Sequence, residues 1–546
     1  MGEHGTYAAL ATLRPGGTVD EGAWTSMLEV IDAREDCADF RLLVVLRLLL
    51  AGRVPEALRS RVERSVLGFR YWMSEPGDDS MCFWSENHQL IFATCELLAG
   101  RRFPGRVFGN DGRLGAEHAA AARTRLVRWL RLRQRFGFSE WLSPVYYEED
   151  VAALVVLADH AGDPELAAMA TGVLDLLLLD VALHTWREVF SPSAGRVYER
   201  QKTEPLTGEM QLVVADAFGD GVPEPRWNQL GMLFVLREHY RVPAVLREIA
   251  RSGGPVTVRS GHGLDVSEAA RVFRDPHEPE TTGALLWAME AFVTPGSVVA
   301  TMTAYDRWRL DGNRFLTGLR ALRRVPRRLL PTVVRALRPV VSGTALQRAD
   351  VVTHRGVSYA ISSAQHHQVR GFGDQQHLWQ ALLPGGVAVF ATHPGSALVG
   401  DESRNSTPDA WVGNGVNPDV GQDGPVLLSL YDTRGRRGFG EKARVRGSHL
   451  YVPSSRLDTH LAGDDWLVLG AGGGLLGVRS TGRLVRRGDA YEQAGPVTAW
   501  VVVGVELADH GSPEAFRDWL RGRPVSLHRG LPGRARLTAT VGGTYE

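Results

Sequence analysis

The stretch "GNRFLTGLRALRRVPRRLLPTVVRALRPVVSGTALQR", residues 312–348, divides the chain into two halves with different hydrophobic periods. It contains nine arginines and no acidic residue. Charge runs are usually solvated, so we interpret it as a linker or connecting helix whose arginines pair with domain surfaces. The alternative is an electrostatic track for an anionic substrate or a membrane surface.

The half before this stretch, residues 25 to about 310, has apolar residues at every third or fourth position. Segments such as "FRLLVVLRLLLAG" (40–52) and "DVAALVVLADHAG" (150–162) have this helical period and end in glycine. Short turns containing proline follow several of them. We therefore expect antiparallel helical hairpins arranged as a solenoid or a toroid.

The half after this stretch has a period of two. "DVVTHRGVSYAISS" (350–363), "GGVAVFATHPG" (385–395) and "PVTAWVVVGVE" (496–506) are expected strands between turn residues, and regular strand spacing predicts a β-sandwich. One short helix is expected in "GSPEAFRDWLRG" (511–522), with Ser512 as its N-cap.

Composition excludes several classes of protein. A chain of 546 residues is too long for one hydrophobic core, and 44% hydrophobic with 23% charged residues is typical of globular proteins. The formal net charge of zero argues against nucleic-acid binding. We expect no membrane span, and a cytoplasmic protein as written or a secreted one if a signal was removed. The cysteines, expected to be core thiols, are Cys37, Cys82 and Cys95.

The stretch "FWSENHQLIFATCELLAG", residues 83–100, begins a helix with an acid, an amide and an imidazole side by side. With Ser85 as the N-cap, Asn87 and His88 take the second and third helical positions, where unpaired backbone N–H groups point. Such a first turn can hold a carboxylate. The alternative is that Asn87 and His88 are ordinary capping and packing residues.

A second polar cluster lies in "RFGFSEWLSPVYYEEDVAAL", residues 135–154, before a helix expected to begin near Glu148. A tyrosine here could transfer a proton. Because its ordinary pKa is about 10, it would need cationic or hydrogen-bonding neighbours to favour the phenolate. The alternative is that these aromatic residues pack against the helix entry.

The two clusters together resemble the helical toroid of polysaccharide lyases of the heparinase II/III and alginate lyase kind. The resemblance is carried by "ENH" at the helix start and by Tyr146 in "SPVY", 58 residues after His88. In the β half, "QHHQVRGFGDQQHLWQALLPGGVAVFATHPG" (365–395) is similar to the histidine-rich opening of that family's β-sandwich. The resemblance implies an incomplete (α/α) toroid over residues 1–311, the linker over 312–348 and an antiparallel β-sandwich over 349–546.

The resemblance also implies an activity, the β-elimination of a glycan that contains a uronic acid. The substrate would be an anionic polysaccharide or oligosaccharide. Asn87 and His88 would neutralise the uronate carboxylate, and Tyr146 would take the C5 proton and return one to the leaving oxygen. His366 or His367 would act as the base for the opposite stereochemistry.

Some members of that family carry zinc in the sandwich. Here "HHQVRGFGD" (366–374) replaces a regular H-x-H-x-D pattern. We therefore expect no cofactor, with a zinc ion in the sandwich as the alternative. Its candidate ligands, which lack a tight zinc spacing, are His366, His367, Asp374, His377 and His393.

Other residues are expected to line the substrate cleft. Trp84 and Trp141 would offer stacking platforms for sugar rings, with packing in the core as the alternative. The polar stretch 401–424 is long enough to be a functional loop, or a surface loop folded on its own turns. The remaining expected contacts are Glu86, Gln89, Glu140, Tyr147, Arg404, Asn405, Trp411 and Asn414.

Two other functions are compatible with the sequence. Helical toroids also occur in glycoside hydrolases, which use paired carboxylates. A non-catalytic protein that binds acidic glycans would retain the same fold. The carboxylates that could serve a hydrolase are Glu86, Glu140, Glu148, Glu149 and Asp150.

Overall fold

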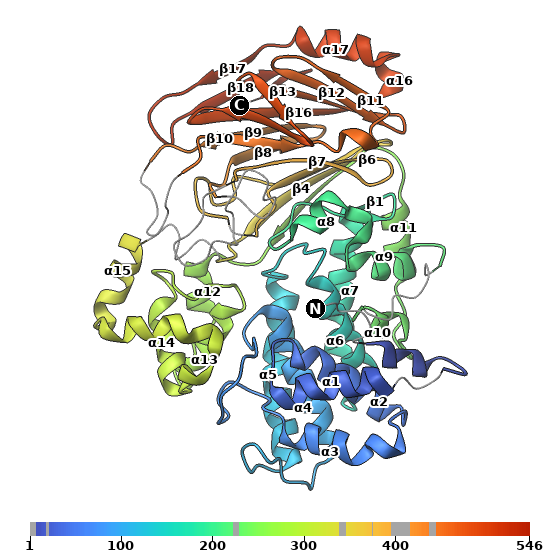
Figure 1. Cartoon of the computed structure of the whole chain (residues 1–546), viewed down its shortest axis with the longest axis vertical. Coiled ribbons are helices and arrows are strands. Elements are labelled where there is room, and N and C mark those ends of the chain that lie inside the picture. Colours follow the sequence, from blue (N-terminus) through green and yellow to red (C-terminus); the bar gives the residue numbers. More distant parts are fainter. Residues whose placement is uncertain are drawn as a thin grey trace.

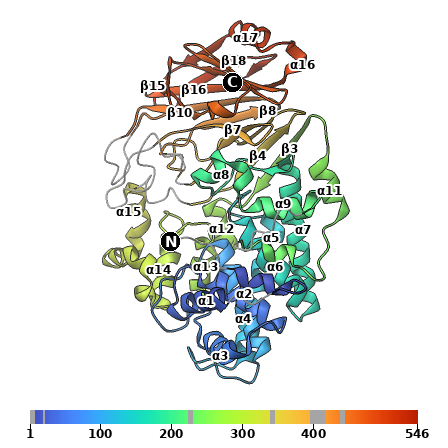
Figure 2. The same cartoon turned by 45° about the vertical axis from the view of Figure 1, so that its right-hand side comes forward.

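The computed structural model describes residues 7–17, 21–221, 229–337, 345–373, 375–394, 415–435 and 444–545. A helical part forms one end of the molecule and stacked sheets form the other (Figure 1). Turned by 45°, the sheets still lie across the end of the helical part (Figure 2). The predicted order, a helical domain followed by an antiparallel β-sandwich, is confirmed.

The helical hairpins form an inner and an outer layer. The inner helices α2 (Ala38–Leu50), α4 (Glu86–Arg102) and α6 (Tyr147–His160) pack against one another and are buried on nearly every face. The outer helices α5 (Gly115–Phe136) and α7 (Pro164–His184) bury mainly one face. The outer layer also includes α1 (Glu21–Ala33) and α3 (Arg59–Gly68).

The difference between the layers follows from the sequence. In α5, Leu126, Trp129 and Leu130 recur at helical spacing and are buried, while arginines fill the other face. In α4 even the polar residues of the first turn are buried. Buried polar groups need partners, so the start of α4 is a place where the fold must supply hydrogen bonds.

Helix α7 is long and apolar enough to cross a membrane by length and composition alone. It packs against α5, α6 and α11 (Ala244–Arg251), and 44% of its most apolar window is buried. A core helix of a soluble protein passes the same test, so this helix is weak evidence for a membrane span.

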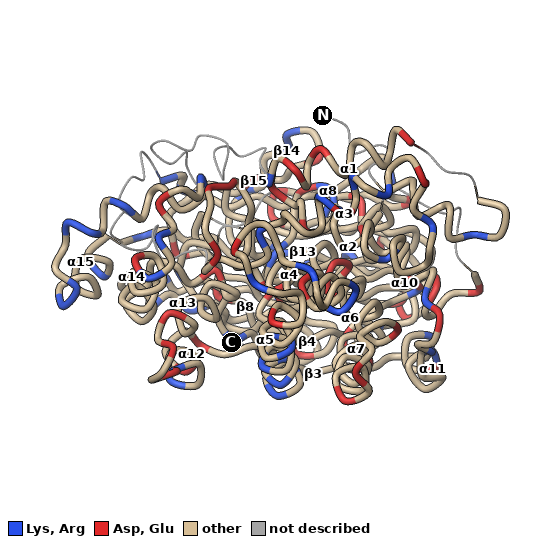
Figure 3. Tube along the Cα trace, turned by 90° about the horizontal axis from the view of Figure 1, so that it is seen from below, with Lys and Arg blue, Asp and Glu red and all other residues tan. Residues whose placement is uncertain are grey.

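The second half of the helical part consists of shorter helices, and the last of them lie beside the Arg-rich stretch 312–348. Arg323 pairs with Asp306 and Asp311, and Arg327 also pairs with Asp306. These pairs support the interpretation that the arginines serve local surfaces, and Figure 3 shows basic and acidic residues interspersed over this end of the molecule. The helices are α8 (Glu199–Thr203), α9 (Met210–Phe218), α10 (Met232–Val235), α12 (Val266–Val272), α13 (Pro279–Trp287), α14 (Val298–Arg307) and α15 (Leu330–Leu337).

The β part stacks an eight-stranded sheet on a six-stranded sheet, and all strand pairs named here are antiparallel. Trp500 crosses between them, since its indole N–H donates to Ser448 Oγ over 2.9 Å. The larger sheet has the order β14 (Leu484–Arg487), β15 (Ala490–Ala494), β10 (Gly447–Tyr451), β7 (Val387–Thr392), β6 (Trp379–Leu383), β5 (Ala360–Ala364), β4 (Ala349–Arg355) and β3 (Val256–His262). The smaller has β11 (Thr459–Ala462), β12 (Trp466–Ala471), β13 (Gly474–Ser480), β16 (Val497–Glu506), β9 (Val426–Asp432) and β8 (Asp419–Asp423).

Two small sheets and two further α-helices accompany the helical layers and the stacked sheets. Ser512 is the N-cap of α17 (Pro513–Arg521) and accepts the N–H of Ala515, as predicted. The remaining elements are β1 (Thr185–Trp186), β2 (Val189–Phe190), α16 (Leu507–His510), β17 (Val525–His528), β18 (Arg536–Thr540) and β19 (Thr544–Tyr545).

Strand β3 corrects the predicted domain boundary. It lies within the 1–311 segment that was expected to be helical, yet it pairs along its whole length with β4 and forms an edge of the large sheet. Its sequence "VTVRSGH" alternates in burial, as an edge strand does. The period of two spans only seven residues, so the helical pattern on either side hid it.

A chain of polar side chains joins α7 to the large sheet. His184 Nδ1 lies 2.7 Å from Thr353 Oγ1 on β4, and its Nε2 lies 3.0 Å from Ser260 Oγ on β3. Ser260 Oγ also lies 2.8 Å from His262 Nε2. Both histidines are buried, so this chain fixes the helical part against the sheet.

Acid should weaken this junction. Burial lowers the pKa of His262 to about 4 and that of His184 well below its ordinary value. Both are neutral in the folded protein, so unfolding takes up protons once the pH is below the unfolded pKa of about 6.5. The stabilisation is complete above that pH and is lost as the pH falls toward the pKa values of the two histidines in the folded protein.

We expect the melting temperature to fall between about pH 7 and about pH 5. His184→Gln, which keeps a donor and an acceptor, should flatten this dependence; an unchanged slope would contradict the assignment.

Candidate active site

The first turn of α4 has the predicted geometry. Ser85 is the N-cap, and its hydroxyl accepts the N–H of His88 over 3.4 Å and also bonds Asn87 Oδ1. Asn87 Oδ1 accepts the same N–H over 2.9 Å. The amide nitrogen Nδ2 of Asn87 is buried and has no hydrogen-bond partner among the residues that the structure describes. A buried donor without a partner is rare, so this amide is a candidate donor to a ligand oxygen.

Glu86 fixes this turn to the second polar cluster. Its carboxylate accepts the N–H of Ser139 over 2.8 Å and the N–H of Glu140 over 3.0 Å. It also forms an ion pair with Arg133 of α5, and both side chains are buried. Glu86 was predicted to contact substrate. Its carboxylate is instead already bound by partners within the protein.

His88 contacts the first turn of α2. Its Nδ1 lies 2.8 Å from Asp39 Oδ2, and its ring stacks on Phe40 at 4.7 Å between centroids. Burial opposes the charged imidazole, but Asp39 favours it and leaves the pKa of His88 above its ordinary value. One ring nitrogen of His88 is thus committed to the protein.

Arg196 is the centre of the second cluster. Its Nη1 donates to Glu140 Oε1 over 2.5 Å and to Glu290 Oε1 over 3.3 Å, while its Nε donates to Gln375 over 3.0 Å. Its Nη2 donates to the hydroxyl of Tyr146 over 2.9 Å. Burial opposes its charge, but Tyr146, Glu140 and Glu290 raise the pKa of Arg196 well above its ordinary value. Arg196 is therefore a fixed cation.

Tyr146 lies at the rim of this cluster. The guanidinium of Arg196 sits 4.2 Å from the centre of its ring, and its hydroxyl lies 2.5 Å from that of the exposed Tyr198. Burial raises the pKa of Tyr146 well above its ordinary value, and Arg196 lowers it only in part. Tyr146 is thus a phenol in the free protein, next to the cation that would stabilise its phenolate.

Glu140 connects the two predicted clusters. Its backbone N–H binds Glu86 beside Asn87, and its side chain binds the guanidinium that holds Tyr146. Its charge also contributes to raising the pKa of both His88 and Tyr146. The first turn of α4 and Tyr146 therefore border the same buried carboxylate.

The two adjacent histidines of the β part take different positions. His367 is buried, contacts the edge of Trp141 at 5.5 Å, and lies 3.2 Å from the carbonyl of Arg348. Burial lowers the pKa of His367 to about 4. His366 is exposed and bonds Asp419 over 2.6 Å. Both line a cavity of about 630 Å³ between the helical part and the large sheet. Of the two, His367 lies nearer the Tyr146 cluster through Trp141.

The structure places three expected substrate contacts in the packed interior. Trp84 lies edge-on among the rings of Trp287, Phe292 and Phe315. Trp141 is fully buried, so neither tryptophan presents a face to a sugar ring. Tyr147 is also fully buried, and its hydroxyl accepts the N–H of Leu142 over 2.9 Å.

Gln89 also serves the fold. Its amide donates to the carbonyls of Trp84 and Ala284 over 2.8 and 2.7 Å, and it lines a separate cavity of about 290 Å³ in the helical part. Gln89 is thus not part of the Tyr146 cluster. Four further predicted contacts lie outside the described residues: Arg404, Asn405, Trp411 and Asn414.

The carboxylates that a hydrolase would use are mostly enclosed. Glu148 accepts the N–H of Gly231 over 2.8 Å. Burial, helped by neighbouring carboxylates, raises the pKa of Glu149 and of Asp150 well above their ordinary values. Both side chains are buried, so they are neutral acids of the interior rather than a pair that faces a substrate.

Among the described residues, the histidines expected to bind zinc in the sandwich form no group of three potential ligands. His377 Nε2 lies 2.7 Å from Gln380 Oε1, and His393 Nε2 lies 2.9 Å from the carbonyl of Val445. Asp374 lies outside the described residues. Within the described ranges, groups of three potential ligands occur only in the helical part, at Asp36–Cys37–His88 and at Glu75–Asp111–His118.

Sequence reasoning missed four residues of the Tyr146 cluster, namely Arg196, Tyr198, Glu290 and Gln375. They come from segments distant in the sequence, and no local pattern marks them. One signal exists at Gly195, where an added Cβ would lie 2.9 Å from the indole nitrogen of Trp141. That close approach holds Arg196 beside Glu140.

Comparison with known proteins gives only distant likenesses. No protein-family model and no curated protein sequence matches the chain. The solved structures that resemble it include a heparinase III, with a TM-score of 0.37, 9% identity and coverage of 96% of this chain and 79% of that one. A chondroitin AC lyase from Streptomyces coelicolor A3 has a TM-score of 0.24, 13% identity and coverage of 96% and 81%. The heparan sulfate lyase HepC from Pedobacter heparinus has a TM-score of 0.20, 10% identity and coverage of 93% and 94%. TM-scores this low establish neither a family nor an activity.

The ion pair of Glu86 with Arg133 should contribute strongly to stability. Glu86→Gln leaves a buried guanidinium without its counter-charge, and we expect a loss of about 3–5 kcal/mol in the free energy of unfolding. The matched control is Glu165→Gln, which breaks an exposed pair with Arg123 and should change the free energy of unfolding far less, because solvent screens that pair. Urea denaturation measures both. Equal destabilisation by the two substitutions would show that the Glu86 pair does not hold the α4 turn.

Proposed function

We propose that this protein is a polysaccharide lyase that cleaves a uronate-containing glycan by β-elimination. The observation that supports it most strongly is the phenol of Tyr146, held at the rim of a buried cluster by a permanent cation. A protein that only binds glycans needs no proton-transfer group with such a neighbour. Proton abstraction by tyrosine needs one, because the cation favours the phenolate.

We assign the carboxylate-binding role to Asn87. The C5 proton of a uronate is weakly acidic because the adjacent carboxylate resists further negative charge. The unpaired Nδ2 group of Asn87 can donate to that carboxylate and stabilise the enolate-like charge as it develops. His88 already uses Nδ1 for Asp39, so its part in this role is to hold the turn that presents Asn87.

We assign the proton transfers to Tyr146. Once deprotonated, its phenolate takes the C5 proton, and the electrons of the C5–H bond form the C4=C5 double bond as the C4–O4 bond breaks. The leaving O4 then takes a proton from the Tyr146 hydroxyl, which restores the phenolate. His367 is a less suitable base here, because Gln368 Nε2 lies 3.1 Å from its Nε2 and the carbonyl of Arg348 lies beside its Nδ1.

The test is an ultraviolet assay for the new double bond with alginate, heparin, heparan, chondroitin, hyaluronan and glucuronan. We expect absorbance to rise with the native protein. Tyr146→Phe should reduce kcat by about 10²–10⁴-fold, because general acid–base catalysis contributes about that much. Asn87→Ala should reduce it by about 10²–10³-fold through loss of one charge-stabilising donor. Unchanged melting temperatures would confirm that both variants fold.

Other outcomes separate the competing functions. New reducing ends without unsaturation, lost in Glu140→Gln and retained in Tyr146→Phe, would indicate a glycoside hydrolase. Binding of an acidic glycan with neither product would indicate a non-catalytic protein. Either result would refute the proposed elimination.

Tyr198 should set the pH dependence of the reaction. Burial is the main cause of the raised pKa of Tyr146, and the hydroxyl of Tyr198 raises it further. If the phenolate is the active base, the rate rises with pH through the pKa of Tyr146. Tyr198→Phe removes a group that raises this pKa, so the rising limb should shift to lower pH. Tyr198 is exposed, and its loss should leave the fold intact. A shift to higher pH, or none, would contradict the base role of Tyr146.

A further inference from the structure

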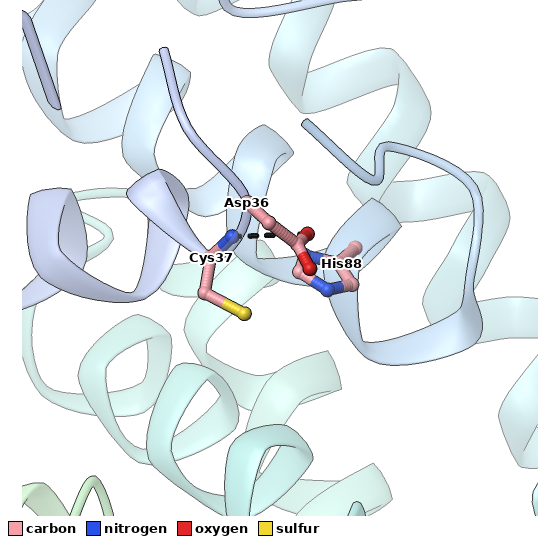
Figure 4. Close-up of side chains that lie close together, drawn as sticks. All are labelled: Asp36, Cys37 and His88. Atoms are coloured by element: carbon pink, nitrogen blue, oxygen red, sulfur yellow. Dashed lines mark hydrogen bonds between the residues drawn. The ribbon is translucent and has the colours of Figure 1, made fainter. Parts of the chain in front are cut away.

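A cluster of potential metal ligands lies at the far side of His88. Asp36 and Cys37 end the loop before α2, and His88 comes from the first turn of α4. The three side chains point toward a common space (Figure 4), and their ligand atoms all lie within 4.8 Å of one another. Asp36 is exposed, Cys37 is half-buried and His88 is buried, so the cluster opens to solvent on the Asp36 side.

We propose that Asp36, Cys37 and His88 bind a divalent transition-metal ion, for which Zn²⁺ is the best chemical match. A thiolate, an imidazole and a carboxylate are the three ligand types that zinc accepts in proteins. Calcium and magnesium, in contrast, prefer oxygen ligands alone. Three protein ligands leave one tetrahedral position open.

A second observation supports the site independently of the three ligands. Asp39 is fully buried, and its Oδ2 lies 2.8 Å from His88 Nδ1. A histidine that binds a metal usually donates its other ring N–H to a carboxylate, which fixes the tautomer and the ring orientation. With Nδ1–H bound to Asp39, Nε2 is the ring nitrogen that remains to bind a cation in place of a proton, and the stacked ring of Phe40 holds the plane of the imidazole.

The backbone of Cys37 also has an unusual conformation. Its φ is 59°, in the left-handed region, and its N–H donates to Asp36 Oδ1 over 3.1 Å. This bond brings the side chains of two adjacent residues to the same side, which an extended backbone would separate. Both then face His88.

The other ligand cluster of the helical part shows what a satisfied site looks like. At Glu75, Asp111 and His118, the guanidinium of Arg113 lies 3.2 Å from Glu75 Oε1 and 2.5 Å from Asp111 Oδ2. An arginine already supplies the positive charge there. Among the described residues, no arginine or lysine forms an ion pair with Asp36.

This metal site is independent of the proposed elimination reaction. Because metal binding is measured without substrate, its test can fail while the lyase assay succeeds, and the reverse. The protein, freed of metal with a chelator, is titrated with Co²⁺ and then with Zn²⁺. We expect one equivalent of Co²⁺ to give a thiolate-to-cobalt charge-transfer band, which Zn²⁺ displaces. Cys37→Ser should abolish this band, while Cys82→Ser, which changes a cysteine outside the cluster, should retain it.

Asp39→Asn tests the positioning residue. It should keep the band but weaken Zn²⁺ binding by about 10–100-fold, the usual effect of losing such a partner. Alkylation of the native protein avoids any question of variant folding. Zn²⁺ should protect Cys37 from iodoacetamide, as mapped by mass spectrometry, and leave Cys82 as reactive as before. Absence of saturable binding, or binding that Cys37→Ser leaves unchanged, would overturn the proposal.

Discussion

A single guanidinium joins the parts of the molecule that make up the candidate active site. Arg196 reaches Glu140 and Tyr146 in the helical part and Gln375 in the β part, and Glu290 completes its shell. Its position depends on a segment that runs between the two parts. The N–H and carbonyl of Ala194 pair with the backbone of His377, while the N–H of Gly195 binds the carbonyl of Trp141.

Around this centre the interior of the helical part is unusually acidic. Arg133 lies against Glu86 and Arg196 lies against Glu140, so each of these two carboxylates has a counter-charge. Neither carboxyl oxygen of Asp150 has a hydrogen-bond partner among the described residues, and burial keeps this carboxyl neutral. An anionic ligand near this interior would be repelled by unpaired carboxylates, so the pairing and neutralisation of these acids is a physical condition for binding one.

Local features of the sequence predicted much of the fold and the start of α4. Ser85 as an N-cap requires only a short polar residue before a helical pattern, and the structure has that cap. The change of period from three or four to two predicted the helical part and the sandwich. Strand β3 was missed because its partner β4 follows only after the Arg-rich segment, and a short alternating run between helices has no local signal of pairing.

The candidate site was predicted less completely, for a related reason. Tyr146 stood out through its neighbours in the sequence, whereas Arg196 and Glu290 meet it only through tertiary packing. The sequence leaves two roles open for Trp84 and Trp141, because tryptophan is common both in hydrophobic cores and at sites where a sugar ring stacks. Burial decides between the two, and burial depends on residues such as Trp287 and Gly195 that lie far along the chain.

The pairing of β3 with β4 has a consequence for synthesis of the chain. Strand β3 leaves the ribosome before α12 to α15 and must wait for β4 with its backbone hydrogen-bonding groups unpaired. An unpaired strand is a template for association with other chains. Thr257 and Arg259 interrupt the apolar residues of β3. The charged side chain of Arg259 on this unpaired strand disfavours its pairing with the same strand of another chain. The large sheet can therefore form only late in translation, after the helical part has emerged. The hydrogen bond from Arg196 to Gln375 forms at the same late stage.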